Sequence, residues 1–162
     1  MTARDIDVSR IINEAREDPD LFSKIDVDAL LDSLESTQND FLEGYTIDSI
    51  AENVFHSLKQ LEFVDSALLA EHCRKLVGYR HVDELHVLHK GKYVRWIRKD
   101  TPTPQLMAGG IVVDVKFGDA GVNVLVRTTS GRFTQYRFDK CLTYQKLTDE
   151  EQLILMLYAR VD

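Results

Sequence analysis

The hydrophobic pattern of the chain changes its period near His89, from the helical 3.6 residues before it to 2 residues after it. A period of 3.6 is typical of an amphipathic helix, whereas a period of 2 is typical of a strand with one buried face. The change therefore predicts helices followed by a sheet, which is an α+β architecture. With 162 residues, the chain is long enough for one domain or for two small ones that share a core.

The clearest predicted helix follows Thr46, whose hydroxyl is a good N-terminal cap. Apolar residues recur at helical spacing along it, so we expect a buried stripe made of Ile47, Ile50, Ala51, Val54, Phe55, Leu58 and Leu61. Phe55 is the largest side chain of this stripe, and its replacement by alanine would be costly if it is buried.

Four other helices are predicted from apolar spacing and capping residues. One covers residues 27–36 and starts after the cap residue Asp26. Another covers residues 8–15, for which a loose tail is the equal alternative. The next begins at Ser66 and ends before Gly78, which suits a left-handed C-terminal cap; its inward residues would be Leu68, Leu69, Cys73, Leu76 and Val77. The last follows a capping box formed by Thr148 and Glu151, and its apolar face would contain Leu153, Ile154, Leu157 and Tyr158.

Five short strands are predicted after His89 from the alternation of apolar and polar residues: Tyr93–Ile97, Ile111–Phe117, Gly121–Thr129, Arg132–Phe138 and Leu142–Lys146. Glycine-containing turns at residues 118–121 and 130–131 would join three of them as hairpins. In the second strand, alternation places Ile111, Val113, Val115 and Phe117 on one face.

Four or five short antiparallel strands are too few for a β-sandwich and suit a small, strongly bent barrel. The segments GKYVRWI, GGIVVDV, GVNVLVR and RFTQYRF resemble SH3-like and Tudor-like barrels in strand number, spacing and turn placement. The resemblance implies a binding role by analogy of fold. We therefore expect an acidic helical region at residues 1–89, a basic, small antiparallel SH3-like β-barrel at 90–147, and a C-terminal helix at 148–162 that packs on the body.

Charge is divided unevenly along the chain, whose net charge is -7. Residues 1–79 contain 7 Lys and Arg against 17 Asp and Glu, whereas residues 80–148 contain 12 against 6. Residues 149–162 contain 1 against 4. Such a split can steer a charged partner or attract the two parts of the chain to each other.

Two features suggest a cytoplasmic protein without a membrane partner. No apolar run approaches the ~20 residues of a membrane helix, and the first residues open into an acidic helical pattern. Cys73 and Cys141 lie far apart and match no disulfide framework, as expected in a reducing compartment.

The order of several segments resembles small uncharacterised proteins encoded by nucleocytoplasmic large DNA viruses. These segments are VDEL at 82–85, then GKYVRWI, GGIVVDVKF and GVNVLVR, and finally KLTDEEQLIL at 146–155. The resemblance implies a viral origin and a place in the host cytoplasm or in the virion. It implies no catalytic residue.

No motif in the sequence predicts a metal, a cofactor or a catalytic group. His72, Cys73, His81, His86 and His89 fall within 18 residues, but no CxxC pair or HExxH motif supports zinc, so we expect solvated or helix-capping histidines. There is no GxSxG motif beside a nucleophile, and Cys141 is expected to be a structural thiol. A strand follows the glycines of GGIVVDV, where phosphate binding requires a helix N-terminus. We therefore expect a protein that is not an enzyme.

The remaining candidate is a basic surface on the predicted barrel, made of Lys90, Lys92, Tyr93, Arg95, Arg98, Lys99, Arg127, Arg132 and Arg137. Cations beside aromatic rings are typical of proteins that bind single-stranded nucleic acid. Alternation places Trp96 in the core, however, and the acidic front half opposes a dedicated nucleic-acid binder. A protein partner is therefore the leading hypothesis, with an accessory nucleic-acid-binding role as the alternative. An enzyme is the third hypothesis, because catalytic groups assembled from distant positions leave no motif in a sequence.

Overall fold

The computed structural model describes residues 42–61 and 66–159, which form an α+β fold of three α-helices and one six-stranded antiparallel sheet. The predicted helices at 8–15 and 27–36 lie outside the described residues. The described residues divide into two compact units. The larger one spans Ile50–Lys146 and contains the whole sheet, while the smaller one contains residues 42–49 and the C-terminal helix.

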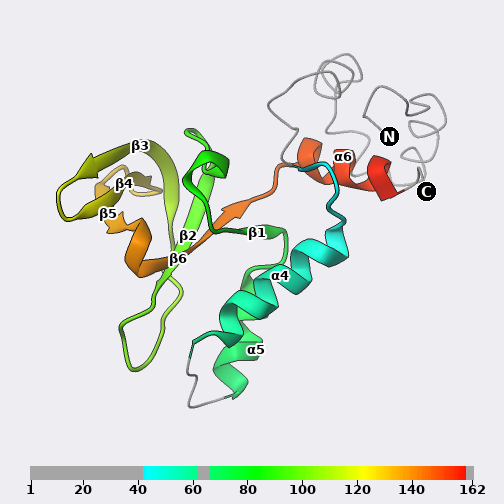
Figure 1. Cartoon of the computed structure of the whole chain (residues 1–162), viewed down its shortest axis with the longest axis horizontal. Coiled ribbons are helices and arrows are strands. Elements are labelled where there is room, and N and C mark those ends of the chain that lie inside the picture. Colours follow the sequence, from blue (N-terminus) through cyan, green and yellow to red (C-terminus); the bar gives the residue numbers. More distant parts are fainter. Residues whose placement is uncertain (1–41, 62–65, 160–162) are drawn as a thin grey trace. The chain divides into compact units, whose positions relative to one another are not determined.

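The sheet has the strand order β1-β6-β2-β3-β4-β5 and is drawn in Figure 1. Its strands are β1 (Tyr79–Val82), β2 (Tyr93–Arg98), β3 (Gly110–Gly118), β4 (Gly121–Thr128), β5 (Phe133–Arg137) and β6 (Cys141–Lys146). Strands β2 to β6 match the five predicted strands within a few residues. The sheet is not closed within the described residues, because β1 and β5 at its two ends do not pair with each other. The closed barrel is therefore not confirmed.

The first strand, β1, lies in the region that we predicted to be helical. It has only four residues, too few to show a period, and it begins directly after Gly78. Its pairing with β6 joins Arg80 to Gln145 and Val82 to Thr143, which are far away in the sequence. A strand formed by such a distant pairing leaves little local signal.

A β-bulge interrupts the pairing of β3 with β4. Val112 pairs with Val126 and Asp114 pairs with Leu125, so Val113 is the extra residue. An extra residue shifts the alternation of side chains beyond it. Our prediction that Ile111, Val113, Val115 and Phe117 share one face is therefore wrong: Ile111 lies on one face of the sheet and Val115, paired with the buried Val124, on the other.

One hydrophobic core lies on the inner face of the bent sheet. Its buried residues are Val82, Leu88, Val94, Trp96, Val112, Val124, Val126, Tyr136 and Cys141. The Trp96 ring stacks on the Tyr136 ring with centroids 4.4 Å apart, and the Thr143 hydroxyl donates a hydrogen bond to the Tyr136 hydroxyl oxygen at 3.0 Å. Burial raises the pKa of the Tyr136 hydroxyl, which stays neutral. The prediction that Trp96 is a core residue is confirmed.

A second core joins the sheet to two helices, α4 (Ile47–Lys59) and α5 (Ser66–Lys75), which lie side by side in Figure 1. Its buried residues are Val54, Leu58, Leu61, Leu76, Ile97, Leu142 and Tyr144. The Ser57 and Tyr144 hydroxyls lie 2.8 Å apart in this core and share a hydrogen bond. The two helices therefore cover β6 and the last part of β2.

Local signals placed the ends of these helices correctly. The Ser49 backbone N–H donates to the Thr46 hydroxyl at 3.0 Å, so Thr46 is the N-terminal cap. Gly78 has a φ of 84°, the left-handed conformation expected after a helix.

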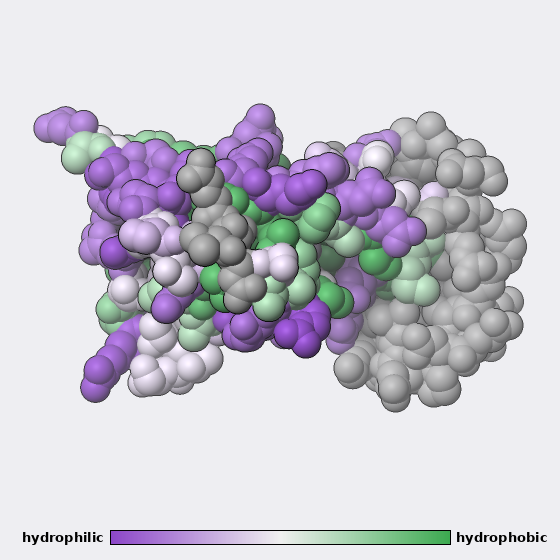
Figure 2. Space-filling view, turned by 90° about the horizontal axis from the view of Figure 1, so that it is seen from below, coloured by the Kyte–Doolittle hydropathy of each residue, from purple (hydrophilic) through white to green (hydrophobic). Residues whose placement is uncertain are grey.

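The predicted inward faces of both helices are partly wrong. Phe55 is 41% exposed, Ile47 is 45% exposed and Val77 is 79% exposed. The buried stripe of α4 contains Ser57, because its hydroxyl bonds to Tyr144, and it leaves Phe55 beside Lys59, whose Nζ lies 5.3 Å from the ring centroid. Figure 2, which views the molecule from below, shows hydrophobic residues among hydrophilic ones on that face.

The C-terminal helix α6 (Asp149–Ala159) begins at the predicted capping box. The Glu151 N–H donates to the Thr148 hydroxyl at 3.1 Å, and the Thr148 N–H donates to Glu151 Oε1 at 2.9 Å. Both bonds satisfy backbone groups that a helix start leaves unpaired. The prediction of this helix is therefore confirmed.

Candidate functional site

Pairing in the sheet aligns four side chains across four strands on one face. Tyr93 pairs with Ile111, Ile111 with Arg127, and Arg127 with Phe133. Directly opposed residues of antiparallel strands point to the same face. This face is opposite the one that contains Val94, Val112 and Val126, which are buried. The row therefore lies on the outer face of β2 to β5.

Apolar side chains on this outer face are largely open to solvent. Phe133 is 63% exposed, Ile111 is 47% exposed and the bulge residue Val113 is 40% exposed. We call Tyr93, Ile111, Val113, Arg127 and Phe133 the outer-face patch. The helices cover the other half of this face, over β6, so the patch is the half that they leave open.

Two residues of β2 attach the loop before β3 to this region. The Arg95 Nε donates to the Met107 carbonyl oxygen at 2.8 Å, and the Tyr93 hydroxyl donates to the Ala108 carbonyl oxygen at 2.7 Å. The Met107 N–H donates to the Trp96 carbonyl oxygen at 2.9 Å. Met107 is thereby fixed beside β2 with 43% of its surface exposed.

Arg127 supplies positive charge at the patch, and Arg132 adds a second cation in the turn beside it. Both are exposed, and within residues 42–61 and 66–159 neither has a carboxylate oxygen within 4.0 Å. Arg132 lies in the turn that leads into Phe133, and Arg127 is opposite Phe133 in the sheet. Arg127 is therefore the cation on the same face as the exposed ring, whereas alternation directs the Arg132 side chain to the other face of the sheet.

Two of the predicted basic residues are paired with carboxylates. The Lys90 Nζ lies 3.3 Å from Asp114 Oδ1, and an Arg137 Nη2 lies 2.7 Å from Asp139 Oδ2. The pKa of the Asp114 carboxyl is lowered, first by a hydrogen bond from the Val115 backbone N–H and then by Lys90. The pKa of the Asp139 carboxyl is lowered chiefly by the hydrogen bond from Arg137. Both carboxylates are ionised at neutral pH and offset these cations.

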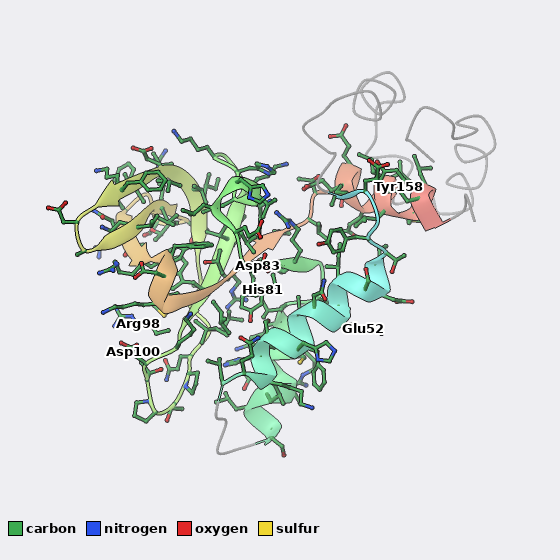
Figure 3. All side chains as sticks on the ribbon, viewed as in Figure 1. Glu52, His81, Asp83, Arg98, Asp100 and Tyr158 are labelled. Carbon is green, nitrogen blue, oxygen red and sulfur yellow. The ribbon has the colours of Figure 1, made fainter. Side chains whose placement is uncertain are left out.

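The predicted basic residues do not form one continuous surface. Tyr93, Arg95 and Arg127 lie on the outer face, and Arg132 lies next to it. Arg98 and Lys99 are at the other end of β2, where Figure 3 shows Arg98 near Asp100, beside the loop that leads to β3. Lys92 is half-buried before β2, where its carbonyl oxygen accepts a hydrogen bond from the Val112 N–H at 3.0 Å.

The exposed apolar members of the region, which the sequence did not reveal as site residues, are Met107, Ile111, Val113 and Phe133. Alternation alone places Ile111 and Val113 on the same face as residues that point inward. The bulge that separates them leaves no motif in the sequence. The run of three apolar residues at 111–113 was the available signal, since a strand with one solvated face does not need three in succession.

The histidines occupy separate environments. His72 is buried and its Nε2 lies 2.9 Å from the Pro104 carbonyl oxygen, so the expectation of a solvated or capping residue is wrong for it. His86 lies 3.2 Å from Glu84, and burial lowers the pKa of His81. Among the residues that the structure describes, no group of three or more His, Cys, Asp or Glu side chains could hold a metal ion.

A chelator should leave the thermal unfolding curve of the protein unchanged. A structural zinc ion contributes to folding, so its removal would lower the midpoint. Differential scanning calorimetry with and without EDTA measures the effect, and metal analysis of the purified protein is the control. One equivalent of zinc, together with a lower midpoint in EDTA, would contradict this account.

The two thiols are held in the neutral form. Burial raises the pKa of Cys141 and that of Cys73. A thiol with a raised pKa is a poor nucleophile, because the thiolate is the reactive form. Neither cysteine therefore has the environment of an activated nucleophile.

No family model matches the sequence, and neither the curated proteins nor the solved structures include a significant match. Within the described part of the chain, no helix has the length and hydrophobicity to cross a membrane.

Proposed function

We propose that this protein is a non-catalytic interaction module whose outer-face patch binds a protein partner. The proposal includes an SH3-like arrangement of β2 to β6. Four consecutive strands form a meander, and the fifth strand, β6, returns to pair with the first, β2. Only the short 3-10 helix Phe138–Lys140 joins β5 to β6, and so short a link between strands on opposite sides of this array favours the strong bend of a small barrel.

The exposed apolar side chains on the outer face carry the proposal. Large apolar side chains gathered beside Arg are typical of the centres of protein interfaces, where aromatic residues and Arg supply most of the binding energy. Ile111, Val113 and Met107 are aliphatic, and aliphatic side chains do not stack on bases as aromatic rings do. The apolar content therefore favours a protein over a nucleic acid.

A second candidate function is accessory binding of single-stranded nucleic acid. The alternation of Tyr93, Arg127 and Phe133 across the sheet favours it, because rings can stack on bases and a cation can contact phosphate. Residues 50–146 also contain 15 Lys and Arg against 10 Asp and Glu. This binding would weaken steeply with salt, whereas binding through apolar contacts would not.

The resemblance of the sequence to proteins of large DNA viruses supports an adaptor or structural component. We place its action in the host cytoplasm or in the virion. Its partner would then be a viral or host protein with an apolar contact surface.

Substitution of the patch should abolish partner capture. We expect a variant with Ile111→Ser and Phe133→Ser to enrich partner proteins at least about tenfold less than the wild type, because the central apolar contacts are lost. Both residues are exposed, so the midpoint of thermal unfolding should change little. Affinity purification with quantitative mass spectrometry measures the enrichment.

The matched control is Phe117→Ser, which removes an aromatic ring that is 77% exposed at the hairpin between β3 and β4, outside the patch. This variant should retain the partners. Nuclease treatment should leave the capture unchanged. Loss of the partners in nuclease, or equal loss in the control variant, would contradict the proposal.

A further inference from the structure

The strand β5 is an edge of the sheet within the described residues, since it pairs with β4 on one side only. It has five residues, Phe133–Arg137, and contains no proline. Proteins commonly protect an edge strand with proline, inward-pointing charges or a covering segment, because an open edge can pair with another chain. Proline protection is missing here.

The residues of β5 whose backbone groups point away from β4 follow from the ladder. The Thr128 N–H donates to the Arg132 carbonyl oxygen at 2.8 Å, so these two residues form a hydrogen-bonded pair. Hydrogen-bonded pairs alternate in an antiparallel ladder, which assigns Thr134 and Tyr136 to the bonds with β4. The N–H and C=O groups of Phe133, Gln135 and Arg137 then face the open edge. Within the described residues no backbone group bonds to this edge.

The side chains at this edge are apolar and cationic. Phe133 is 63% exposed and Gln135 is also exposed. Residues 127–140 contain four cations, Arg127, Arg132, Arg137 and Lys140, against the single carboxylate of Asp139. A partner that approaches this edge meets a net positive field and one large exposed ring, which favours acidic residues and an apolar side chain.

The other edge of the sheet offers no such surface. In β1, Arg80 and Val82 are buried, and Tyr79 and His81 are half-buried. The burial of its side chains leaves β1 without an exposed apolar residue. The open backbone, the exposed ring and the cations occur together only at β5 among the described strands.

We propose that β5 receives an extended, acidic segment of a partner protein as an added strand, with an apolar side chain of the segment packed on Phe133. This inference rests on the proposed function and names the form of its partner. An edge presents alternating N–H donors and C=O acceptors, which a second peptide backbone matches. A phosphate backbone offers only acceptors, and the carbonyl groups of the edge would repel it.

The test uses a capped peptide, acetyl-Glu-Val-Glu-Leu-Glu-Val-Glu-amide, and the full chain. Fluorescence anisotropy of the same peptide with fluorescein in place of the acetyl group measures affinity. NMR-detected hydrogen exchange with the acetylated peptide measures protection of each backbone amide. An added strand should slow exchange roughly tenfold or more at Phe133, Gln135 and Arg137, whose N–H groups face the edge. Thr134 and Tyr136 should change less, because β4 already protects them.

The variant Gln135→Pro removes one edge N–H and keeps the bonds of Thr134 and Tyr136 to β4. This substitution should weaken binding of the peptide about fivefold to tenfold. That is the loss of affinity expected for one missing hydrogen bond together with local distortion. A peptide with N-methyl groups at alternate residues tests the same bonds without changing the protein. The N-methylated peptide should bind to the wild type about as weakly as the unmodified peptide binds to the Gln135→Pro variant.

Two control ligands and one comparison of variants separate the outcomes. The peptide with Lys in place of Glu should bind at least about tenfold more weakly, as charge complementarity requires. Binding of oligodeoxythymidylate as tightly as the acidic peptide would overturn the inference. A dissociation constant above about 1 mM for the acidic peptide would also overturn the inference. Unchanged exchange rates at the three edge amides would do the same. If Gln135→Pro retains partner proteins that the Ile111→Ser and Phe133→Ser variant loses, the added strand is wrong while the proposed function stands.

Discussion

Replacement of Trp96 by alanine should lower the free energy of unfolding by about 3–5 kcal/mol. The indole is 4% exposed and stacks on the Tyr136 ring at the centre of the inner core. Its removal leaves a cavity that the sheet cannot fill, because the Trp96 backbone is fixed by its pairing with Thr143 in β6 and by the hydrogen bond from the Met107 N–H. Equilibrium urea denaturation, followed by circular dichroism, measures the change.

The matched control for this prediction is Phe55→Ala. Phe55 also has an aromatic ring, but it is 41% exposed on α4. Its loss should cost no more than about 1 kcal/mol, the size of a partly exposed contact with Lys59. Equal destabilisation by the two substitutions would contradict the placement of both rings.

Replacement of Gly109 by alanine should lower the free energy of unfolding by about 3 kcal/mol. Gly109 has a φ of 85°, and a Cβ atom there would overlap the Val94 carbonyl oxygen. Its neighbour Gly110 pairs with Val94, so the overlap would push β3 away from β2. The same urea titration measures the loss, and heteronuclear NMR would show shifts along β2 and β3.

Gly91 offers a control with the same backbone conformation. Its φ is also 85°, but no atom lies within 4 Å of the position of an added Cβ. Gly91→Ala should therefore cost only the strain of a left-handed alanine, about 1 kcal/mol. Equal losses of unfolding free energy in Gly91→Ala and Gly109→Ala would show that overlap with the Val94 carbonyl oxygen is not the cause of the destabilisation at Gly109.

Features with a short-range cause could be predicted from the sequence. The caps at Thr46 and Gly78 and the capping box at Thr148 depend on residues within one helical turn, and the structure has all three. Strands β2 to β6 were predicted because alternation and glycine turns are also local. These signals identified most of the elements of the larger unit.

Features that depend on distant pairing could not be predicted. β1 exists because β6 pairs with it, and Ser57 turns inward because Tyr144 is placed opposite. No pattern within α4 distinguishes Phe55 from the buried Val54, because only the packed sheet determines which side of the stripe is covered.

The candidate site was predicted in part for the same reasons. Tyr93, Arg95 and Arg127 are recognisable in the sequence as basic or aromatic residues of predicted strands, and the structure places them on one face. The bulge at Val113 and the exposure of Phe133 arise from the register of three strands. The apolar part of the surface therefore emerged only when the strands were paired.

Site-specific photo-crosslinking at Phe133 tests the binding face most directly. Phe133 would be replaced by p-benzoylphenylalanine, which keeps an aromatic side chain at this exposed position, and an equivalent protein would have the probe at Phe117. Each protein would be irradiated in a nuclease-treated extract of the cells in which it is made. We expect discrete protein adducts from position 133 and none from position 117. Adducts from position 117 alone, or adducts at position 133 that contain only nucleic acid in untreated extract, would contradict the account.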